Sequence, residues 1–224
     1  MALPDEEKEI GEIVNRLLDN LAATMQSQVG REGVLFRSKV GDVRARHMDY
    51  LKAGTFTTEL LAAFTIAYEA EAKLSGFQVM HAALFDEEPE GEISKAIVQA
   101  AIGLCLSTES KLISAVEYTS RDDVESAIAV MKEAFNEARD LAADASDSSL
   151  YRALTSLAGS VTAHLANVAR PLPRMVEFRS MAIEPALVLS NRFYYEPERW
   201  EELVLENKIV HPAFCPRILR GLAS

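Results

Sequence analysis

Apolar residues recur at helical spacing through most of the 224-residue chain. Between Ile10 and Met25 they return at alternating steps of four and three residues, which predicts an amphipathic helix. Asp5 is placed to cap the start of this helix, and Gly30 is placed to stop it. Residues 31–56 are less regular and are punctuated by glycine.

Two further stretches, residues 58–85 and 92–118, carry apolar residues on most faces of a helix. This pattern favours helices that are enclosed by neighbouring helices. The longest apolar run, Ala96–Leu106, falls well short of the roughly 20 residues that a membrane span needs. We therefore expect no membrane span.

The clearest helical pattern lies between Val124 and Ala145, where a strict four-three alternation persists over three heptads and predicts a narrow packing seam. A second seam follows after a short connection, with Asp147 or Ser148 as its cap, so the two helices are expected to form an antiparallel hairpin. The first seam comprises Val124, Ile128, Met131, Phe135, Ala138, Ala142 and Ala145, and the second Leu150, Leu154, Leu157, Val161 and Val168. His164 falls on the second seam, where we interpret it as a satisfied core or interface histidine.

The composition changes near residue 170. Six of the eight prolines and six of the sixteen aromatic residues lie beyond it, and seven basic residues there balance seven acidic ones. The entire net charge of −11 therefore belongs to residues 1–170. We predict two domains, an α-helical domain over 1–170 and a smaller one over 171–224.

The smaller domain has its own pattern of elements. Residues 175–181 and 217–222 have the composition of short strands, and two helices between them open at Pro185 and Pro197. The predicted order is strand, helix, helix, strand. The fold class is therefore mainly α, with long antiparallel helices in a bundle and a small C-terminal β-α-α-β module.

The bulk composition restricts the class of protein. The apolar fraction of 49% and the charged fraction of 25% are ordinary for a soluble globular protein. A net charge of −11 repels a phosphate backbone, so nucleic acid is a disfavoured partner. Cys105 and Cys215 are too few for a disulfide framework and suit a reducing cytoplasm, and no signal peptide is visible.

The C-terminal segment "PALVLSNRFYYEPERWEELVLENKIVHPAFCP" ends in an Asn-x-Ile element followed by His-Pro-x-Phe-x-Pro. It resembles the C-terminal region of the phage Mu-type DNA circularisation protein family, and its β-α-α-β order resembles a LysM-like module. The likeness extends upstream to cover about residues 117–224, roughly half of the chain. The β-rich N-terminal domain of that family has no counterpart in residues 1–116, and "EPERWEE" is more acidic than the usual turn. The matching positions are Arg192, Tyr194 or Tyr195, Arg199, Leu203, Asn207, Ile209, His211, Pro212, Phe214 and Pro216.

This resemblance implies a structural subunit of a contractile phage tail baseplate, without enzymatic activity, cofactor or metal. Its implied partners are other tail proteins of the hub, tube or wedge, in several copies per particle. Its implied location is the virion, after synthesis in the host cytoplasm. We take Trp200, Tyr195 and Phe214 as aromatic anchors of a docking surface. The full predicted set of partner-binding residues is Tyr195, Arg199, Trp200, Asn207, Ile209, His211, Pro212 and Phe214.

Three other functions stay open. One is a DNA-binding phage protein that assists genome circularisation, one is a peptidoglycan-binding accessory protein, and one is a cytoplasmic helical adaptor that shares the motif by chance. The one basic stretch, residues 31–52, has a net charge of +3 and suits DNA or an acidic subunit, although a solvated or interprotein face is the default interpretation.

Catalytic and ligand sites are weaker hypotheses. The acids Glu196, Glu198, Glu201, Glu202 and Glu206 suggest a carboxylate pair, but five acids on one short helix are more often a solvated face. His211 and Cys215, with Glu206 nearby, lack the paired spacings of a structural zinc site. Trp200 with Phe193, Tyr194 and Tyr195 suits a sugar-stacking platform, but core packing is the preferred interpretation. No nucleotide-binding or nucleophile motif occurs in the sequence.

Overall fold

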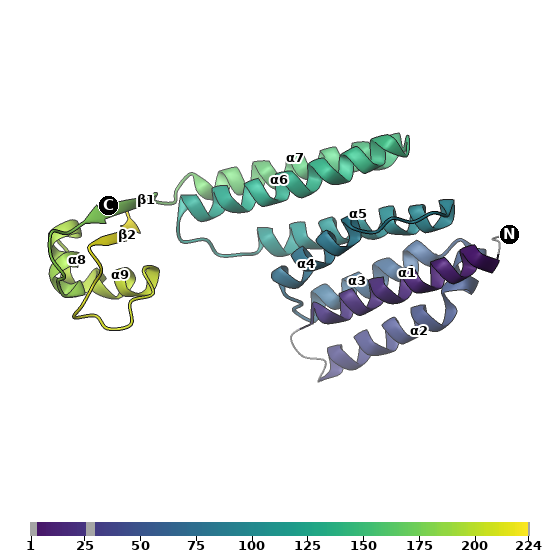
Figure 1. The fold of residues 1–224 in the computed structure, drawn as a ribbon, viewed down its shortest axis with the longest axis horizontal. Coiled ribbons are helices and arrows are strands. Elements are labelled where there is room, and N and C mark those ends of the chain that lie inside the picture. The colour runs from purple at the N-terminus through teal and green to yellow at the C-terminus, as the bar shows by residue number, and fades with distance from the viewer. Residues whose placement is uncertain (1–3, 26–29, 224) are drawn as a thin grey trace. The chain divides into compact units, whose positions relative to one another are not determined.

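The computed structural model describes residues 4–25 and 30–223 (Figure 1). These residues form nine α-helices, one short 3-10 helix and a sheet of two antiparallel strands. The protein is therefore mainly helical, as the sequence predicts. Its internal contacts define two units: Met1–Val116 with Ala129–Ala163, and Glu117–Ile128 with His164–Ser224.

Five helices lie wholly within the first unit. Helix α5 packs against α1, α3 and α4, and α2 packs against α1 and α3. The rings of Phe36, Phe64 and Phe77 are fully buried between these helices, with the centroids of Phe64 and Phe77 at 6.0 Å. The five helices are α1 (Pro4–Ala23), α2 (Arg31–Ala53), α3 (Phe56–Glu69), α4 (Leu74–Phe85) and α5 (Glu92–Ser114).

Helix α5 is the one helix among the described residues that is long and apolar enough to cross a membrane by length and composition. The sequence-based expectation did not include it, because the helix continues on both sides of the apolar run Ala96–Leu106. In the structure, 56% of its most apolar window is buried inside the protein. The central helix of a helical core passes the same test, so we describe α5 as the core helix of the first unit.

The first helix differs from its prediction at both ends. Helix α1 begins at Pro4, so Asp5 lies in its first turn and is not the cap, and the helix ends at Ala23. Close packing follows directly after this end, because a Cβ at Gly76 in α4 would stand 2.7 Å from the Cα of Thr24. Residues 26–29, which the prediction included before Gly30, lie outside the described residues.

The irregular stretch after residue 30 is one helix. Helix α2 runs through two glycines and has a kink at Arg46, where φ is −119°. Gly54 ends it in the left-handed conformation, with φ at 68°, which a residue without a Cβ adopts at little cost. Glycine inside α2 therefore lowers helix propensity without breaking the helix, because buried Phe36 and Val43 hold one face against the core.

Helices α6 (Arg121–Asp144) and α7 (Ser148–Ala169) continue the chain. Asp147 caps α7, because its Oδ1 accepts the backbone N–H groups of Ser149 and Leu150 at 3.0 Å each. His164 is exposed, contrary to its predicted place on the seam, and Leu165 is buried instead. The predicted seam of α6 is buried at Val124, Met131, Phe135, Ala138 and Ala142, while Ala145 lies beyond the helix end and is exposed.

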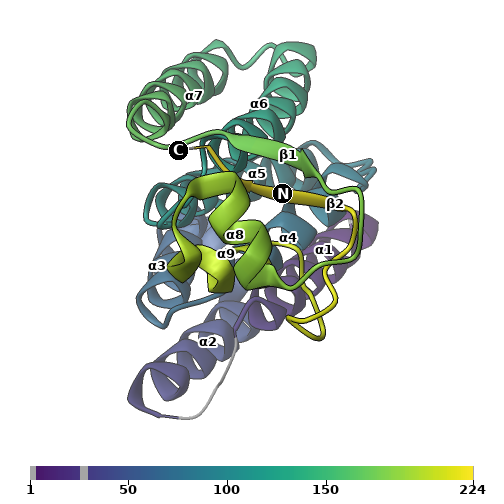
Figure 2. The ribbon, with the colours of Figure 1, turned by 90° about the vertical axis from the view of Figure 1, so that its left-hand side faces the viewer.

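The second unit contains the β-α-α-β order that the sequence predicts. The strands pair antiparallel, from Met175 opposite Leu222 to Arg179 opposite Ile218. Figure 2 shows α8 and α9 on the same side of this sheet. The elements are β1 (Met175–Arg179), α8 (Ala186–Tyr194), the 3-10 helix Pro197–Arg199, α9 (Trp200–Glu206) and β2 (Ile218–Leu222).

A compact core joins the sheet to these helices. Phe178 of β1 stacks on Phe193 at 4.4 Å between ring centroids and meets the ring of Tyr194 edge-on at 5.4 Å. The buried residues of this cluster are Ala186, Leu189, Tyr194, Leu203, Cys215 and Leu219. A module of about 50 residues thus has its own apolar core, which the rise in aromatic content after residue 170 indicated.

The second unit also includes the start of α6. The backbone N–H of Arg121 donates to the carbonyl of Pro173 at 2.9 Å, and the N–H of Met175 donates to the Asp122 carboxylate at 2.7 Å. Ser120 caps the same helix end through the N–H of Asp123. These bonds tie the proline-containing linker to α6, so contacts draw the boundary differently from the composition change at residue 170.

Candidate docking site

Two loops of the second unit lie side by side. The N–H of Ser180 donates to the carbonyl of Arg217 at 2.7 Å, and the N–H of Cys215 donates to the carbonyl of Glu184 at 3.1 Å. A third bond joins the N–H of Ala186 to the carbonyl of Pro212 at 2.7 Å. The segments 180–186 and 212–217 are therefore joined at three points along their length, next to the end of the two-stranded sheet.

These loops carry exposed apolar side chains. Val210 is fully exposed, Met181 is 97% exposed and Phe214 is 70% exposed. Single exposed apolar residues are common on protein surfaces, but a group of them on paired loops is typical of an interaction site. We call the group the apolar strip; its members on or next to the two loops are Met181, Ile183, Leu187, Val210, Phe214 and Ile218.

Glu184 fixes the first loop. The Arg192 guanidinium donates two hydrogen bonds to its carboxylate, at 2.6 and 2.7 Å, and the hydroxyl of Ser180 donates a third at 2.6 Å. These interactions, Arg192 first and Ser180 second, lower the pKa of the Glu184 carboxyl. Since its backbone carbonyl also accepts from Cys215, Glu184 holds both loops in one arrangement.

The predicted partner-binding residues fall into two groups, and the first lies at the surface. Tyr195 is 87% exposed and takes the left-handed backbone conformation, with φ at 60°. His211 is exposed, and its ring centroid lies 5.4 Å from that of Phe214. The Nδ1 atom of His211 accepts the N–H of Ala213 at 3.2 Å, which keeps the His-Pro turn closed.

The second group builds the module. The Arg199 guanidinium lies 3.8 Å from the ring centroid of Tyr194 and makes two hydrogen bonds to Glu202, at 2.9 and 2.8 Å. Trp200 and Ile209 are partly buried against the module core.

Asn207 and Pro212 also hold backbone in place. The Asn207 side chain bonds the backbone of Leu203 and Arg220. Pro212 is half-buried and offers its carbonyl to α8. These contacts give Arg199, Trp200, Asn207, Ile209 and Pro212 structural roles, whatever they contribute to binding.

Five members of the strip, Met181, Ile183, Leu187, Val210 and Ile218, were missed by the sequence-based prediction, which had weighted aromatic and motif residues. Met181 and Ile183 precede Pro185, Leu187 follows it, and Val210 directly precedes the His-Pro step. Apolar residues next to prolines, outside any helical or strand periodicity, are the signal that would have found these four. Their side chains have no core position to fill, because the loops run along the surface.

Tyr194 lies beneath this surface. Burial, followed by the nearby Glu202 carboxylate, raises the pKa of its phenol to about 12. The phenol oxygen packs against the Cα of Gly221, so a side chain at residue 221 would overlap it and would stand 2.9 Å from Phe178. With Tyr194 buried and Phe193 stacked on Phe178, the four residues of the suggested sugar platform do not share one exposed face.

The other candidate sites are placed as follows. Cys215 is buried, and its thiol donates to the carbonyl of Pro212 at 3.6 Å, whereas His211 is exposed. Across residues 4–25 and 30–223, no group of three or more His, Cys, Asp and Glu side chains is arranged to hold a metal ion. Of the five clustered acids, Glu202 is engaged by Arg199, and the other four are exposed.

The basic stretch forms part of α2. Three of its six cations pair with carboxylates, in the ion pairs Lys39–Glu59, Arg44–Asp19 and Arg46–Asp42. Asp42 also accepts the hydroxyl of Tyr50 at 2.6 Å, and this bond, followed by Arg46, lowers the pKa of its carboxyl. These ion pairs neutralise part of the positive charge within the protein, which weakens the case for a phosphate-binding face.

Comparison with known proteins adds no assignment: no family model and no curated protein matches the sequence.

Proposed function

We propose that the chain is a non-enzymatic assembly protein that docks onto a partner protein through the apolar strip of its C-terminal module. The observation that carries this proposal is the exposure of six apolar side chains on or next to two loops that backbone hydrogen bonds hold side by side. A preformed apolar surface binds without a large ordering cost, which suits a lasting structural contact.

The assembly we propose is the tail baseplate of a contractile phage, with a hub, tube or wedge protein as the partner. The Asn-x-Ile and His-Pro-x-Phe-x-Pro elements support this assignment by their resemblance to the phage family. The β-α-α-β order, with both helices on one side of the sheet, supports the comparison with a LysM-like module. Heptad-like seams on α6 and α7 would supply the antiparallel helix packing that we propose outside the C-terminal module.

The experiment tests whether the protein is incorporated into phage particles. A strain that carries the gene is induced, particles are purified, and the protein is detected by mass spectrometry. Phe214→Ser combined with Val210→Ser should leave a folded protein that is absent from particles, because both side chains are exposed and contribute little to the core. The matched control is Leu205→Ser, which removes another exposed apolar side chain, 77% exposed, from α9 and not from either loop. Normal incorporation of the double variant would overturn the proposal.

Two binding assays separate the other functions from this one. Retention on DNA that falls with rising salt would favour the circularisation function, and the acidic composition predicts no retention at physiological ionic strength. Co-sedimentation with purified sacculi would favour peptidoglycan binding. If the chain docks onto a protein, we expect neither retention on DNA nor co-sedimentation with sacculi.

A further inference from the structure

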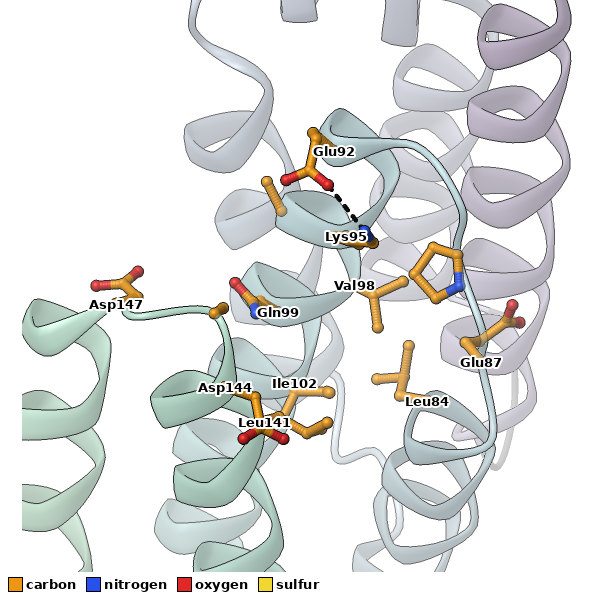
Figure 3. Close-up of a pocket in the computed structure, with 13 residues that line it drawn as sticks. Leu84, Glu87, Glu92, Lys95, Val98, Gln99, Ile102, Leu141, Asp144 and Asp147 are labelled. Carbon is orange, nitrogen blue, oxygen red and sulfur yellow. Dashed lines mark hydrogen bonds and ion pairs between the residues drawn. The ribbon is translucent and has the colours of Figure 1, made fainter.

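An apolar groove with acidic edges lies within the first unit, apart from the docking loops. It has a volume of about 650 Å³ and is bordered by α4, α5 and the C-terminal end of α6. Figure 3 shows Leu84, Val98, Ile102 and Leu141 on its floor and walls. Leu141 is 37% exposed, so part of this apolar surface remains open to solvent.

The groove continues along α5. A second hollow, of about 660 Å³, lies between α5 and α7, and both are lined by Ala96, Gln99 and Asp147. The α5 residues that line the two hollows run from Glu92 to Ser107. At 1.5 Å per residue, this corresponds to roughly 22 Å along the helix axis, which is about the length of four helical turns.

The groove lining carries more acids than bases. It contains Glu87, Glu92, Asp144 and Asp147 with one base, Lys95, and the connection 86–91 before α5 contains four acids and no base. Among the groove-lining residues, Glu87 is paired with Arg16 and Glu92 with Lys95, at 2.6 and 2.8 Å. Asp144 has no ion-pair partner among the described residues.

The helix ends reinforce this charge. Helices α4 and α6 both end at the groove, and neither has a basic residue in its last turn, so their negative ends are not compensated. The positive end of α5 is covered, because the Glu9 carboxylate accepts the N–H groups of Glu90 and Gly91 at 2.6 and 3.1 Å. The lining therefore has a net negative charge around an apolar floor, which suits a cationic ligand.

We propose that this groove binds a cationic amphipathic helix of a partner protein. Leucine-like side chains of that helix would pack on the exposed Leu141, over a floor formed by the nearly buried Val98 and Ile102, while its lysine or arginine side chains would face Asp144 and the acidic connection before α5. The groove's length along α5 matches about 15 residues of such a helix. This surface is independent of the apolar strip, so the chain would bridge two partners.

The test uses the full chain and two synthetic 18-residue peptides with one leucine stripe at helical spacing. One peptide carries lysines on its polar face and the other carries glutamates, and binding is measured by fluorescence anisotropy of labelled peptide. We expect the lysine peptide to bind and the glutamate peptide not to bind. Higher salt should weaken the complex, since the contribution of the acidic edges is screened.

Matched variants locate the binding surface. Ala96→Trp fills the junction of the two hollows, and Asp144→Lys reverses the charge at its edge; each should weaken lysine-peptide binding by about fivefold or more. Ala45→Trp and Asp49→Lys make the same changes at exposed positions on α2 and should leave it unchanged. Circular dichroism establishes that each variant is folded, and Asp144→Lys keeps the test valid if Ala96→Trp unfolds.

Three outcomes would overturn the proposal. The lysine peptide fails to bind, or it binds all variants equally, which indicates general attraction to an acidic protein. The third outcome is a concentration-dependent dimer that Ala96→Trp abolishes, since a second copy of the chain would then be the occupant. None of these results depends on particle incorporation, so the groove and the docking loops are tested separately.

Discussion

The side-chain amide of Asn207 pairs with the backbone of Arg220 in both directions. Its Oδ1 accepts the N–H of Arg220 and its Nδ2 donates to the carbonyl of Arg220, each at 2.7 Å. The Nδ2 also donates to the carbonyl of Leu203 at 2.8 Å. One amide thus joins the end of α9 to β2, which gives the Asn in the Asn-x-Ile element a structural explanation.

Replacing this amide should destabilise the C-terminal module. Asn207→Ala removes three hydrogen bonds of roughly 1 kcal/mol each, so we expect a loss of about 1–3 kcal/mol in the free energy of unfolding. Asn207→Asp should lose at least as much, because a carboxylate oxygen would then face two carbonyl oxygens. The measurement is urea unfolding followed by fluorescence of Trp200, which is the only tryptophan and packs against the module core. An Asp variant as stable as the parent would rule out this bonding pattern.

Gly221 has no room for a side chain. A methyl group there would overlap the phenol oxygen of Tyr194 and crowd Phe178 and Leu203, so Gly221→Ala should destabilise the module by about 1–3 kcal/mol. Gly159 in α7 is the matched control, because a Cβ there meets nothing within 4 Å. Gly159→Ala should stabilise the protein by about 0.5–1 kcal/mol through higher helix propensity. Thermal unfolding by circular dichroism and tryptophan fluorescence measures both changes, and equal effects of the two substitutions would contradict the packing described.

Tyr195 combines an unfavourable backbone conformation with an exposed ring. Tyr195→Gly relieves the left-handed strain and should raise the free energy of unfolding by about 0.5–1 kcal/mol. If the ring is part of the docking surface, the same variant should enter particles less efficiently. Lys208, with φ at 49°, is the control: Lys208→Gly should gain similar stability and retain incorporation. Undiminished incorporation of Tyr195→Gly would remove Tyr195 from the docking surface.

The Glu184 carboxylate makes the loop arrangement dependent on pH. Its pKa is lowered in the folded protein by Arg192 and Ser180, so its stabilising effect is complete above the unfolded pKa of about 4.3 and is lost as pH falls through the folded pKa. Glu184→Gln should therefore flatten the acid side of the module's stability profile, measured by Trp200 fluorescence between neutral and acidic pH. Glu198→Gln, at an exposed carboxylate without an ion pair among the described residues, should leave the profile unchanged. A parent profile that Glu184→Gln does not alter would contradict this role.

Sequence periodicity was most reliable where one face of an element is buried. The seam of α6 was correctly predicted at Val124, Met131 and Phe135, because burial against neighbours imposes the spacing that the pattern records. His164 was misplaced by one position, since a helix with 3.6 residues per turn drifts from a strict heptad and brings Leu165 inward instead. Helix boundaries were predicted less well. Thr24, directly after the end of α1, packs closely against Gly76, 52 positions away in the sequence, and local periodicity does not record such a contact.

The roles of the individual residues in the candidate docking site could not be predicted from the sequence. The motif between Asn207 and Phe214 directed attention to one segment, but a motif does not separate residues that hold a fold from residues that the fold displays. The structure places Asn207 in the first class and Phe214 in the second, and it adds Met181 from the loop before α8.

By itself, the sequence determined the mainly helical composition, the acidic charge of the first 170 residues and the β-α-α-β order of the remainder, because these depend on local periodicity and residue type. Only the tertiary structure decided which apolar side chains stay exposed and which acids gather around a groove. Both depend on backbone hydrogen bonds and helix contacts between segments that are distant in the chain, and such contacts leave no periodic signal in the sequence.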